Sequence, residues 1–476
     1  MGATRPGPLP DGMRVVLDRR VRRLAGRDGG SALLGGAPPK LVHLTPRAQA
    51  VLGDGDAVTV ADPTSRALAR TLLDSGFAHP AHPIPGGPGR SEVTVVVPVK
   101  DRPLDRLLAT LPADLGGLVV VDDGGSDPEG LAATVKAAHG HVIRHETPRG
   151  PAAARNAGLA AATTPLVMFL DSDVVPQEGW LDPLLAHLAD PAVALVAPRI
   201  VALHPVRGPI ARYEAVRSSL DLGLDPALIV PRSRVAYVPS AAMLVRRDAV
   251  GAGFDEDMHV AEDVDLVLRL HADGRRLRYE PAARVAHDHR TSPRAWWLRK
   301  AYYGTGAAPL ARRHRGAVPP MVLSPWTAAA CAALLAQRRW SVPVAAAVTA
   351  VAAERLSRKL SRLERPRASA ARLAGLGLSG AGLQVGNALL RHHWPLAAVL
   401  LPFSRRARRA VLLAAVAEGL GDWWTHRRHD PAVRPDPVTH LVAHRLDDLA
   451  YGAGLWWGAW KARDTAALRP VSPGRK

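Results

Sequence analysis

The 476-residue sequence predicts an α/β protein: a mostly parallel sheet with helices on both faces, preceded by a small α+β module and followed by a helical region. Three observations predict this fold class. Between residues 91 and 295, continuous runs of β-branched residues alternate with helical stretches. Residues 1–80 combine short alternating apolar and polar runs with two helical stretches. Residues 296–476 show helical stretches and no strand pattern.

The front module, residues 1–80, begins with two expected strands, around 14–17 and 31–34, joined by a glycine-containing turn at 26–30. Two helices are expected to follow, the first with Thr45 as its N-cap and Pro46 as its first residue. Residues 81–90, rich in Pro and Gly, have the composition of a linker. The module contains no catalytic grouping, so we expect it to dock a peptide or a partner enzyme, by β-augmentation if an edge strand is open.

The central region, residues 91–295, contains three apolar runs: SEVTVVVPVK, GLVVVDDGGSD and PLVMFLDSDV. Strands this apolar are typical of a parallel sheet that is covered on both faces. Ligands of such sheets bind at the carboxyl ends of the strands. Because polar residues follow each of these runs, we expect the functional site at that edge.

The final region, residues 296–476, is rich in Ala and Leu and carries clustered Arg. Residues 316–337 and 373–390 are uncharged, and basic clusters such as SRRARR at 404–409 flank the apolar stretches. This pattern is typical of interfacial or short spanning helices beside anionic lipid, while a soluble helical bundle is the alternative. With no secretory signal visible at the N-terminus, we expect association with the cytoplasmic side of the cell membrane.

The amino-acid composition bears on which partners and structural modules the protein can have. Lys and Arg number 62 and Asp and Glu 43, a net charge of +19 that indicates an anionic partner, although an Arg-rich compositional bias gives the same excess. No nucleic-acid-binding module is recognisable and basic residues concentrate beside apolar helices, so we expect no nucleic-acid partner. The single cysteine, Cys331, excludes an intramolecular disulfide and a Cys-rich zinc module.

Two motifs suit a nucleotide. Asp122 and Asp123 end the second apolar run, where a carboxylate can accept a hydrogen bond from a ring N–H or a ribose hydroxyl. A helix expected to open at 150–151 places Arg155 one turn inside its positive end, which suits a phosphate. An Asx turn and a solvated helix residue are the respective structural alternatives.

Asp171 and Asp173 directly follow the third apolar run. Carboxylates two residues apart on an extended chain point the same way and repel unless a cation joins them. Oxygen ligands favour Mg²⁺ or Mn²⁺, with substrate phosphates completing the coordination shell. A surface pair of carboxylates is the alternative. His287, expected to share a strand face with His289, is a further candidate ligand or else polar surface.

Glu262 and Asp263 lead into an apolar helix. Acidic residues are favoured in a first helical turn by the helix dipole alone, but this position also fixes a general base on a rigid element. Trp297 belongs to a Trp- and Tyr-rich segment that suits stacking on an acceptor or a place at a membrane interface.

In this order, the motifs between residues 93 and 290 resemble those of family 2 glycosyltransferases with the GT-A fold. The resemblance implies that Asp123 contacts uracil, with Pro98 and Asp122 on the same nucleotide-sugar side, and that Arg155 lies beside the diphosphate. It implies that Asp171 and Asp173 hold Mn²⁺ or Mg²⁺ and the nucleotide sugar; His287 stays a candidate third ligand on its strand position alone. It also implies that Asp263 of the Glu262-Asp263 pair is the catalytic base. We expect Glu262 and, from its aromatic chemistry, Trp297 on the acceptor side.

The flanking segments extend the resemblance over nearly the whole chain. Together with the front module, RTSPRAWWLRKAYYGTGAAPLA and RLDDLAYGAGLWWGAW resemble the mycofactocin-system glycosyltransferases. That family implies a PqqD-like front module and an inverting transfer of glucose from UDP-glucose to pre-mycofactocin, building a β-linked oligoglucoside. A membrane-associated family 2 glycosyltransferase with a polysaccharide or glycolipid acceptor is the alternative.

Overall fold

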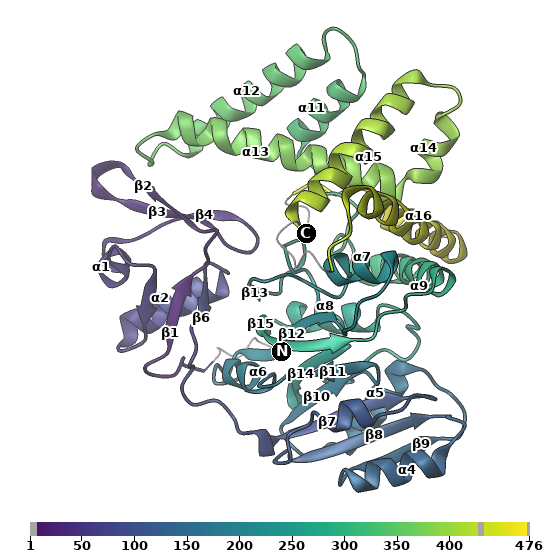
Figure 1. Ribbon diagram of the computed structural model, residues 1–476. Coiled ribbons are helices and arrows are strands. Elements are labelled where there is room, and N and C mark those ends of the chain that lie inside the picture. Colours follow the sequence, from purple (N-terminus) through teal and green to yellow (C-terminus); the bar gives the residue numbers. More distant parts are fainter. Residues whose placement is uncertain (1–6, 427–432, 474–476) are drawn as a thin grey trace. The chain divides into compact units, whose positions relative to one another are not determined.

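The computed structural model describes residues 7–426 and 433–473, which divide into two compact units (Figure 1). The first unit contains the N-terminal strands and the large sheet, in residues up to 23, 33–205 and 218–289. The second unit contains residues 24–32, 206–217 and those from 290 onward. The domain boundaries expected at residues 80, 90 and 295 stay predictions.

The N-terminal segment forms two small sheets. In the first, β1 (Arg14–Leu17) pairs antiparallel with both β5 (Ala57–Thr59) and β6 (Ala78–Pro80). The second has the order β2 (Arg22–Ala25), β3 (Ser31–Gly35), β4 (Lys40–His43). The two expected strands are present, but the expectation that one turn joins them is wrong. β2 lies between them, and η1 (Arg27–Gly29) links β2 to β3.

Two capped helices complete this segment. α1 (Pro46–Leu52) begins as expected, with the Thr45 hydroxyl accepting from the Ala48 N–H at 3.2 Å and Pro46 at the first position. α2 (Pro63–Asp74) is capped by Asp62, which accepts from the Thr64 and Ser65 N–H groups. Such caps satisfy N–H groups that have no partner inside the helix. Leu72, Leu73, Val15 and Phe77 then pack into a small core.

The large sheet has nine strands, with β13 off the main path. The order along the path is β11 (Val174–Pro176), β15 (Arg276–His287), β12 (Val193–Ala202), β14 (Ala242–Arg246), β10 (Leu166–Leu170), β7 (Val93–Val99), β8 (Gly117–Asp123), β9 (His141–His145). β13 (Ala227–Leu228) pairs antiparallel with β15. Because β14 is antiparallel to both β10 and β12, and β12 is parallel to β15, six strands of the path share one direction. The expected mostly parallel sheet is therefore present, interrupted by β14.

Helices cover both faces of this sheet, as expected. On β7, Val93, Val95 and Val97 face one core and Val96 faces the other, because successive residues of a strand point to opposite sides. The first face is covered by α3 (Asp105–Leu108), α4 (Pro128–Ala137) and α6 (Asp182–His187). The second is covered by α5 (Pro151–Ala161) and α8 (Glu262–Ala272). Short turns η2 (Arg90–Glu92) and η3 (Arg247–Ala249) lie at strand ends.

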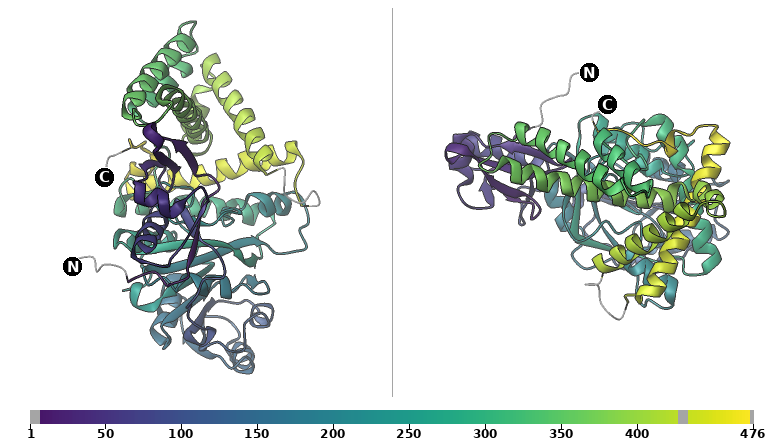
Figure 2. Two further views of the ribbon diagram at one scale, coloured as in Figure 1. Left: turned by 90° about the vertical axis from the view of Figure 1, so that its left-hand side faces the viewer. Right: turned by 90° about the horizontal axis from the view of Figure 1, so that it is seen from above.

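The second unit is helical, as the sequence predicts. Its elements are α7 (Pro209–Arg217), α9 (Pro293–Thr305), α10 (Ala307–Arg313), α11 (Pro325–Leu335), α12 (Ser341–Lys359), α13 (Pro366–Asn387), η4 (Ala388–His392), α14 (Trp394–Leu400), α15 (Arg405–Thr425), α16 (Pro437–Ala462) and η5 (Ala466–Leu468). α12 and α13 lie side by side (Figure 2). Where α9 meets α16, a Cβ on Gly454 would lie 1.7 Å from the Ala301 carbonyl oxygen, so only glycine allows this approach.

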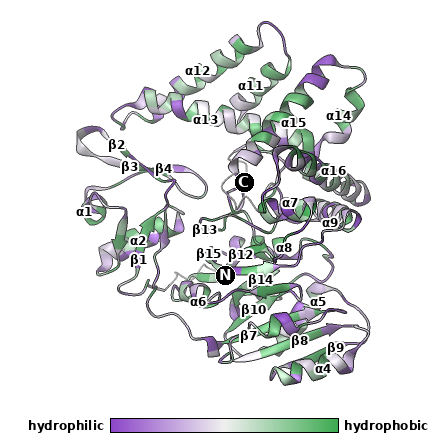
Figure 3. Ribbon diagram, viewed as in Figure 1, coloured by the Kyte–Doolittle hydropathy of each residue, from purple (hydrophilic) through white to green (hydrophobic). Residues whose placement is uncertain are grey.

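Many large apolar side chains of this unit are exposed. Figure 3 shows hydrophobic residues along α11 and along α13 to α15. Phe403, Leu412, Leu413 and Trp460 are among the exposed large side chains. By length and composition, one described helix, the α13–η4 segment Pro366–His392, is able to cross a membrane, and a core helix of a soluble protein passes the same test.

Candidate active site

The predicted site residues of the first unit gather at one edge of the large sheet. Asp122 and Asp123 are the last residues of β8, Asp171 directly follows β10, and His287 is the last residue of β15. These strands point the same way, so their carboxyl ends meet at one edge. Asp263 lies in the first turn of α8. Asp122, Asp123, Asp171 and His287 therefore lie at one edge of the sheet, and their assembly with Asp173 and Asp263 into one nucleotide-sugar site stays a prediction.

The two carboxylates of β8 are held in fixed orientations. Asp122 accepts from the Gly125 N–H at 2.8 Å and forms an ion pair with Arg144. Asp123 accepts from the backbone N–H groups of Arg149 and Gly150 and from His145 Nδ1, each at 2.8 Å. Burial opposes ionisation of Asp123, but these hydrogen bonds hold its pKa below its usual value.

A cleft of about 420 Å³ opens beside β8, at the carboxyl ends of β7 and β8. Val99, Arg102, Asp122, Ser126 and Thr134 are among its lining residues. Pro98 lies next to Val99 on β7, opposite Val121 of β8. The volume lies within the range of about 300–1,000 Å³ that is usual for small-molecule sites.

Arg155 of α5 bridges two acidic residues from different elements. Its Nη2 lies 2.6 Å from Asp171 Oδ1 and its Nη1 lies 2.9 Å from Glu262 Oε1. Its guanidinium carbon also lies 5.3 Å from the centre of the Phe254 ring, within cation–π range. Arg155 thus holds Asp171 and Glu262 together, and its expected contact with a diphosphate stays a prediction.

Asp263 follows Glu262 in the first turn of α8 and is partly buried. Ser240 N–H donates to its Oδ2 at 3.0 Å and Val264 N–H donates to its Oδ1 at 2.8 Å. Desolvation, together with the adjacent Glu262 charge, raises the pKa of Asp263 to about 6. Ala261, just before the pair, has a φ of 66°, a left-handed conformation that is costly for a residue with a Cβ and is concentrated at functional sites. These features suit a general base near neutral pH.

Asp173 and His287 face one another across the edge. His287 Nε2 lies 3.4 Å from Asp173 Oδ1, and His287 Nδ1 lies 3.1 Å from His289 Nδ1. Arg102, which lines the cleft beside β8, lies 4.0 Å from Asp173. A carboxylate and an imidazole that converge in this way can bind a divalent cation.

Trp297 lies in the second unit, on α9, packed beside Tyr213 and Trp296. Trp296 is buried and its Nε1 donates to Glu214 Oε1 at 2.8 Å. Trp296, the neighbour of Trp297 in the Trp- and Tyr-rich segment, is thus a core residue and not part of an exposed acceptor platform or interface belt. The role of Trp297 on the acceptor side stays a prediction.

Sequence reasoning missed several residues of this edge. His145 supports Asp123 across the β8–β9 pair, and Arg102 approaches Asp173. The Phe254 N–H donates to Asn156 Oδ1 at 2.8 Å, which fixes the loop before α8. The sequence carried no signal for His145, because only the observed register of β8 and β9 places it opposite Asp123.

Comparison with known proteins shows which protein family this chain belongs to. The model of glycosyl transferase family 2 matches residues 94–251. The pre-mycofactocin glycosyltransferase of Mycobacterium tuberculosis is 48% identical over 477 residues, covering 99% of each chain. The chain belongs to the pre-mycofactocin glycosyltransferase family, within glycosyltransferase family 2. It is a glycosyltransferase with the GT-A fold, as the sequence motifs predicted.

Other similar proteins match a smaller part of the chain or match it at lower identity. The succinoglycan biosynthesis protein ExoU of Rhizobium meliloti is 31% identical over 176 residues, which cover 34% of this chain and 50% of that protein. Among solved structures, a Pyrobaculum calidifontis mannosyltransferase in complex with GDP-Man and Mn²⁺ is 22% identical. It covers 72% of this chain and 91% of its own, with a TM-score of 0.37.

Proposed function

We propose that this enzyme transfers glucose from UDP-glucose to pre-mycofactocin with inversion at the anomeric carbon. The observation that supports the chemistry is the desolvated Asp263 carboxylate, fixed by the Ser240 and Val264 N–H groups directly after Glu262, the partner of Arg155. The choice of acceptor is supported by the relative that matches over nearly the whole chain and is named for pre-mycofactocin.

In the proposed reaction, Asp263 accepts the proton of the acceptor hydroxyl as that oxygen attacks the anomeric carbon. The bond between this carbon and the UDP oxygen breaks in the same step, so a single displacement inverts the configuration. A positioned base contributes about 10²–10⁴-fold to such a reaction. The Ser240 and Val264 N–H groups fix both carboxylate oxygens of Asp263, which aims the base and limits its reorganisation.

We propose that Asp173 and His287, with Asp171 beside them, hold Mn²⁺ or Mg²⁺. The donors suit such an ion, because carboxylate oxygen is the preferred ligand of both metals and imidazole is accepted by Mn²⁺. When bound, a divalent cation neutralises charge that develops on the departing diphosphate. Asp122, Asp123 and Pro98 would then orient the nucleoside at the neighbouring strand ends.

The first experiment compares Asp263→Asn with Asp257→Asn, a change at an exposed aspartate of the loop before α8. We expect Asp263→Asn to lose transfer by at least about 10²-fold while UDP still binds in calorimetry. The Asp257→Asn control should retain activity. Normal turnover by Asp263→Asn would disprove the base assignment.

The second experiment identifies donor and acceptor. Purified enzyme is incubated with UDP-glucose, UDP-galactose or GDP-mannose in the presence of Mn²⁺, and products are followed by mass spectrometry. We expect successive hexose additions to pre-mycofactocin with UDP-glucose. Transfer only to a polysaccharide or lipid acceptor would instead support the alternative function, and preference for another nucleotide sugar would disprove the donor.

We also propose that the second unit binds the cytoplasmic face of an anionic membrane. Its helices carry exposed large apolar side chains, and basic residues such as those of the SRRARR run lie among them. Flotation with vesicles containing anionic lipid tests this, and the double change Leu412→Ser and Leu413→Ser should weaken binding. Equal flotation with neutral lipid at high salt would contradict the charge component.

We further propose that the N-terminal segment docks a peptide or a partner enzyme. β4 is an edge of its second sheet, and an edge strand can accept an added strand. The end of β2, at the other edge, already bonds to the backbone of residues 362–364. Calorimetry with the unmodified precursor peptide is the test. A proline at Val42 on β4 should abolish binding without loss of transfer to a free acceptor, while equal binding by Val42→Pro would exclude this edge.

A further inference from the structure

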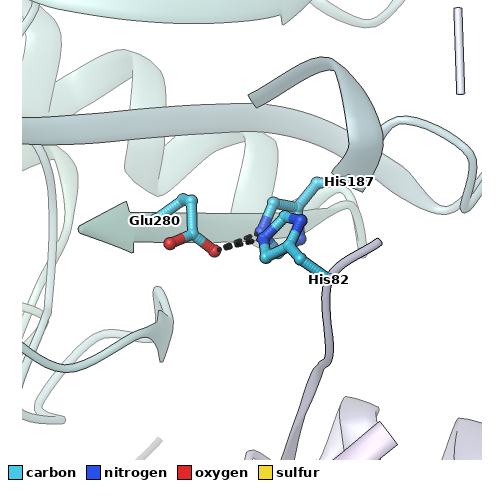
Figure 4. Close-up of side chains that lie close together, drawn as sticks. All are labelled: His82, His187 and Glu280. Atoms are coloured by element: carbon cyan, nitrogen blue, oxygen red, sulfur yellow. Dashed lines mark hydrogen bonds and ion pairs between the residues drawn. The ribbon is translucent and has the colours of Figure 1, made fainter. Parts of the chain in front are cut away.

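A cluster of three metal-binding side chains lies in the first unit, apart from the acidic edge (Figure 4). His82 belongs to the segment after β6, His187 is the last residue of α6, and Glu280 lies within β15. Figure 4 shows the two imidazole rings meeting at the Glu280 carboxylate. One donor atom from each residue lies within 4.8 Å of the others.

The two histidines approach the same oxygen atom. His187 Nε2 lies 2.8 Å and His82 Nε2 lies 3.1 Å from Glu280 Oε2. The Ala282 N–H donates to the other oxygen, Oε1, at 2.9 Å. Glu280 therefore acts purely as an acceptor, which is the behaviour of an ionised carboxylate. Without a metal, each imidazole must carry a proton on Nε2 in order to donate to the Glu280 carboxylate. A bound cation would occupy the position of these two Nε2 protons.

The three side chains of this cluster differ in their exposure to solvent. His187 and Glu280 are only 2% and 5% exposed, while the His82 side chain is 35% exposed. The two rings are nearly perpendicular, with centres 5.6 Å apart, so both Nε2 atoms converge from different directions. An ion can therefore enter from the His82 side and still meet two ligands that the core holds in place.

We propose that His82, His187 and Glu280 form a zinc site. Two imidazole nitrogens and one carboxylate oxygen are a donor set of Zn²⁺ that leaves a fourth position for water. The ligand distances of about 2.0–2.2 Å require only small movements of side chains that already converge. The ion ties the segment after β6 to α6 and to β15 of the large sheet, so its role is to anchor the N-terminal segment.

The donor chemistry separates this site from the catalytic edge. Nitrogen-rich sites select Zn²⁺, whereas sites dominated by carboxylates accept Mn²⁺ or Mg²⁺. Other His and carboxylate groups lie between α15 and α16, at Asp422, His426, His440 and at Glu418, His444, Asp448. Any zinc bound there is unaffected by a change at His82, so the comparison of matched variants isolates the proposed site.

The test uses untagged, chelator-treated full-length enzyme in excess Mn²⁺, with Zn²⁺ binding measured by calorimetry and elemental analysis. The variants are His82→Ala and His187→Gln, and the control is His141→Ala, an exposed histidine on β9. We expect His82→Ala to bind one zinc fewer than His141→Ala, and to lose a zinc-dependent rise in melting temperature. His82→Ala changes an exposed side chain, so its fold, checked by circular dichroism, should be intact. Equal stoichiometry and affinity in His82→Ala and His141→Ala would overturn the proposal.

Discussion

Replacing Arg155 by Met tests how the active site is held together. The Arg155 side chain is 4% exposed and forms ion pairs of 2.6 Å with Asp171 and 2.9 Å with Glu262. Removing one partner of a buried ion pair costs about 3–5 kcal/mol, because the remaining charge stays in a poorly solvated place. The Glu262 side chain is 10% exposed and would be left as a poorly solvated charge, whereas Asp171 is 30% exposed and stays partly solvated, so we expect a loss of stability of about 3 kcal/mol.

The matched control is Arg149→Met. Arg149 forms an ion pair with Glu256 at the same 2.9 Å, but the two side chains are 54% and 42% exposed. Exposed pairs contribute about 0–1 kcal/mol because water solvates the partners after the change. The two variants therefore compare one interaction type at two degrees of burial.

Arg155→Met also tests the role of Asp263 as the general base. Desolvation and Glu262 raise the pKa of Asp263 to about 6, while the Arg155 charge lowers it. Without that charge the pKa rises further. Since the base acts when ionised, the acid limb of the kcat/KM profile should move to higher pH.

The assay is thermal and urea unfolding of both variants, followed by pH profiles of transfer. Arg155→Lys keeps the positive charge but has one ammonium group in place of the guanidinium fork. Its loss of stability should therefore lie between those of Arg149→Met and Arg155→Met. The reasoning is refuted if Arg155→Met unfolds under the same conditions as Arg149→Met and keeps the pH profile of the parent enzyme.

Three further predictions follow from the structure. The kcat/KM of the parent enzyme should fall below a midpoint near pH 6, as Asp263 with its raised pKa becomes protonated; a limb near pH 4 would contradict its desolvation. Gly158→Ala should destabilise the protein by about 1–3 kcal/mol, because the new Cβ would lie 2.2 Å from Val96 Cγ1, and unchanged urea unfolding would contradict this packing. Asp447→Asn should lower the melting temperature of the second unit, because it removes the carboxylate 3.4 Å from buried Lys300, whereas Asp464→Asn, near the surface, serves as its control.

Much of the site was predictable because its residues lie where strands and helices begin or end. Asp123 and Asp171 follow apolar runs, and the cap at Thr45 is a local pattern. Parallel strands bring such ends together whatever the details of packing. The role of Arg155 was not predictable, because both of its partners come from other elements and the helix position alone suggested a phosphate.

The sequence alone determined the alternation of elements, the acidic residues at the sheet edge and the family, since these depend on local patterns and on similarity along the chain. Only the tertiary structure decided that β14 enters the sheet in the opposite direction, that Arg155 is enclosed by carboxylates, and that His82 meets His187 and Glu280. The reason is that pairing, burial and ion-pair partners depend on residues far apart in sequence. Their separation is set by the packing of the whole sheet and its helices, which no local pattern encodes.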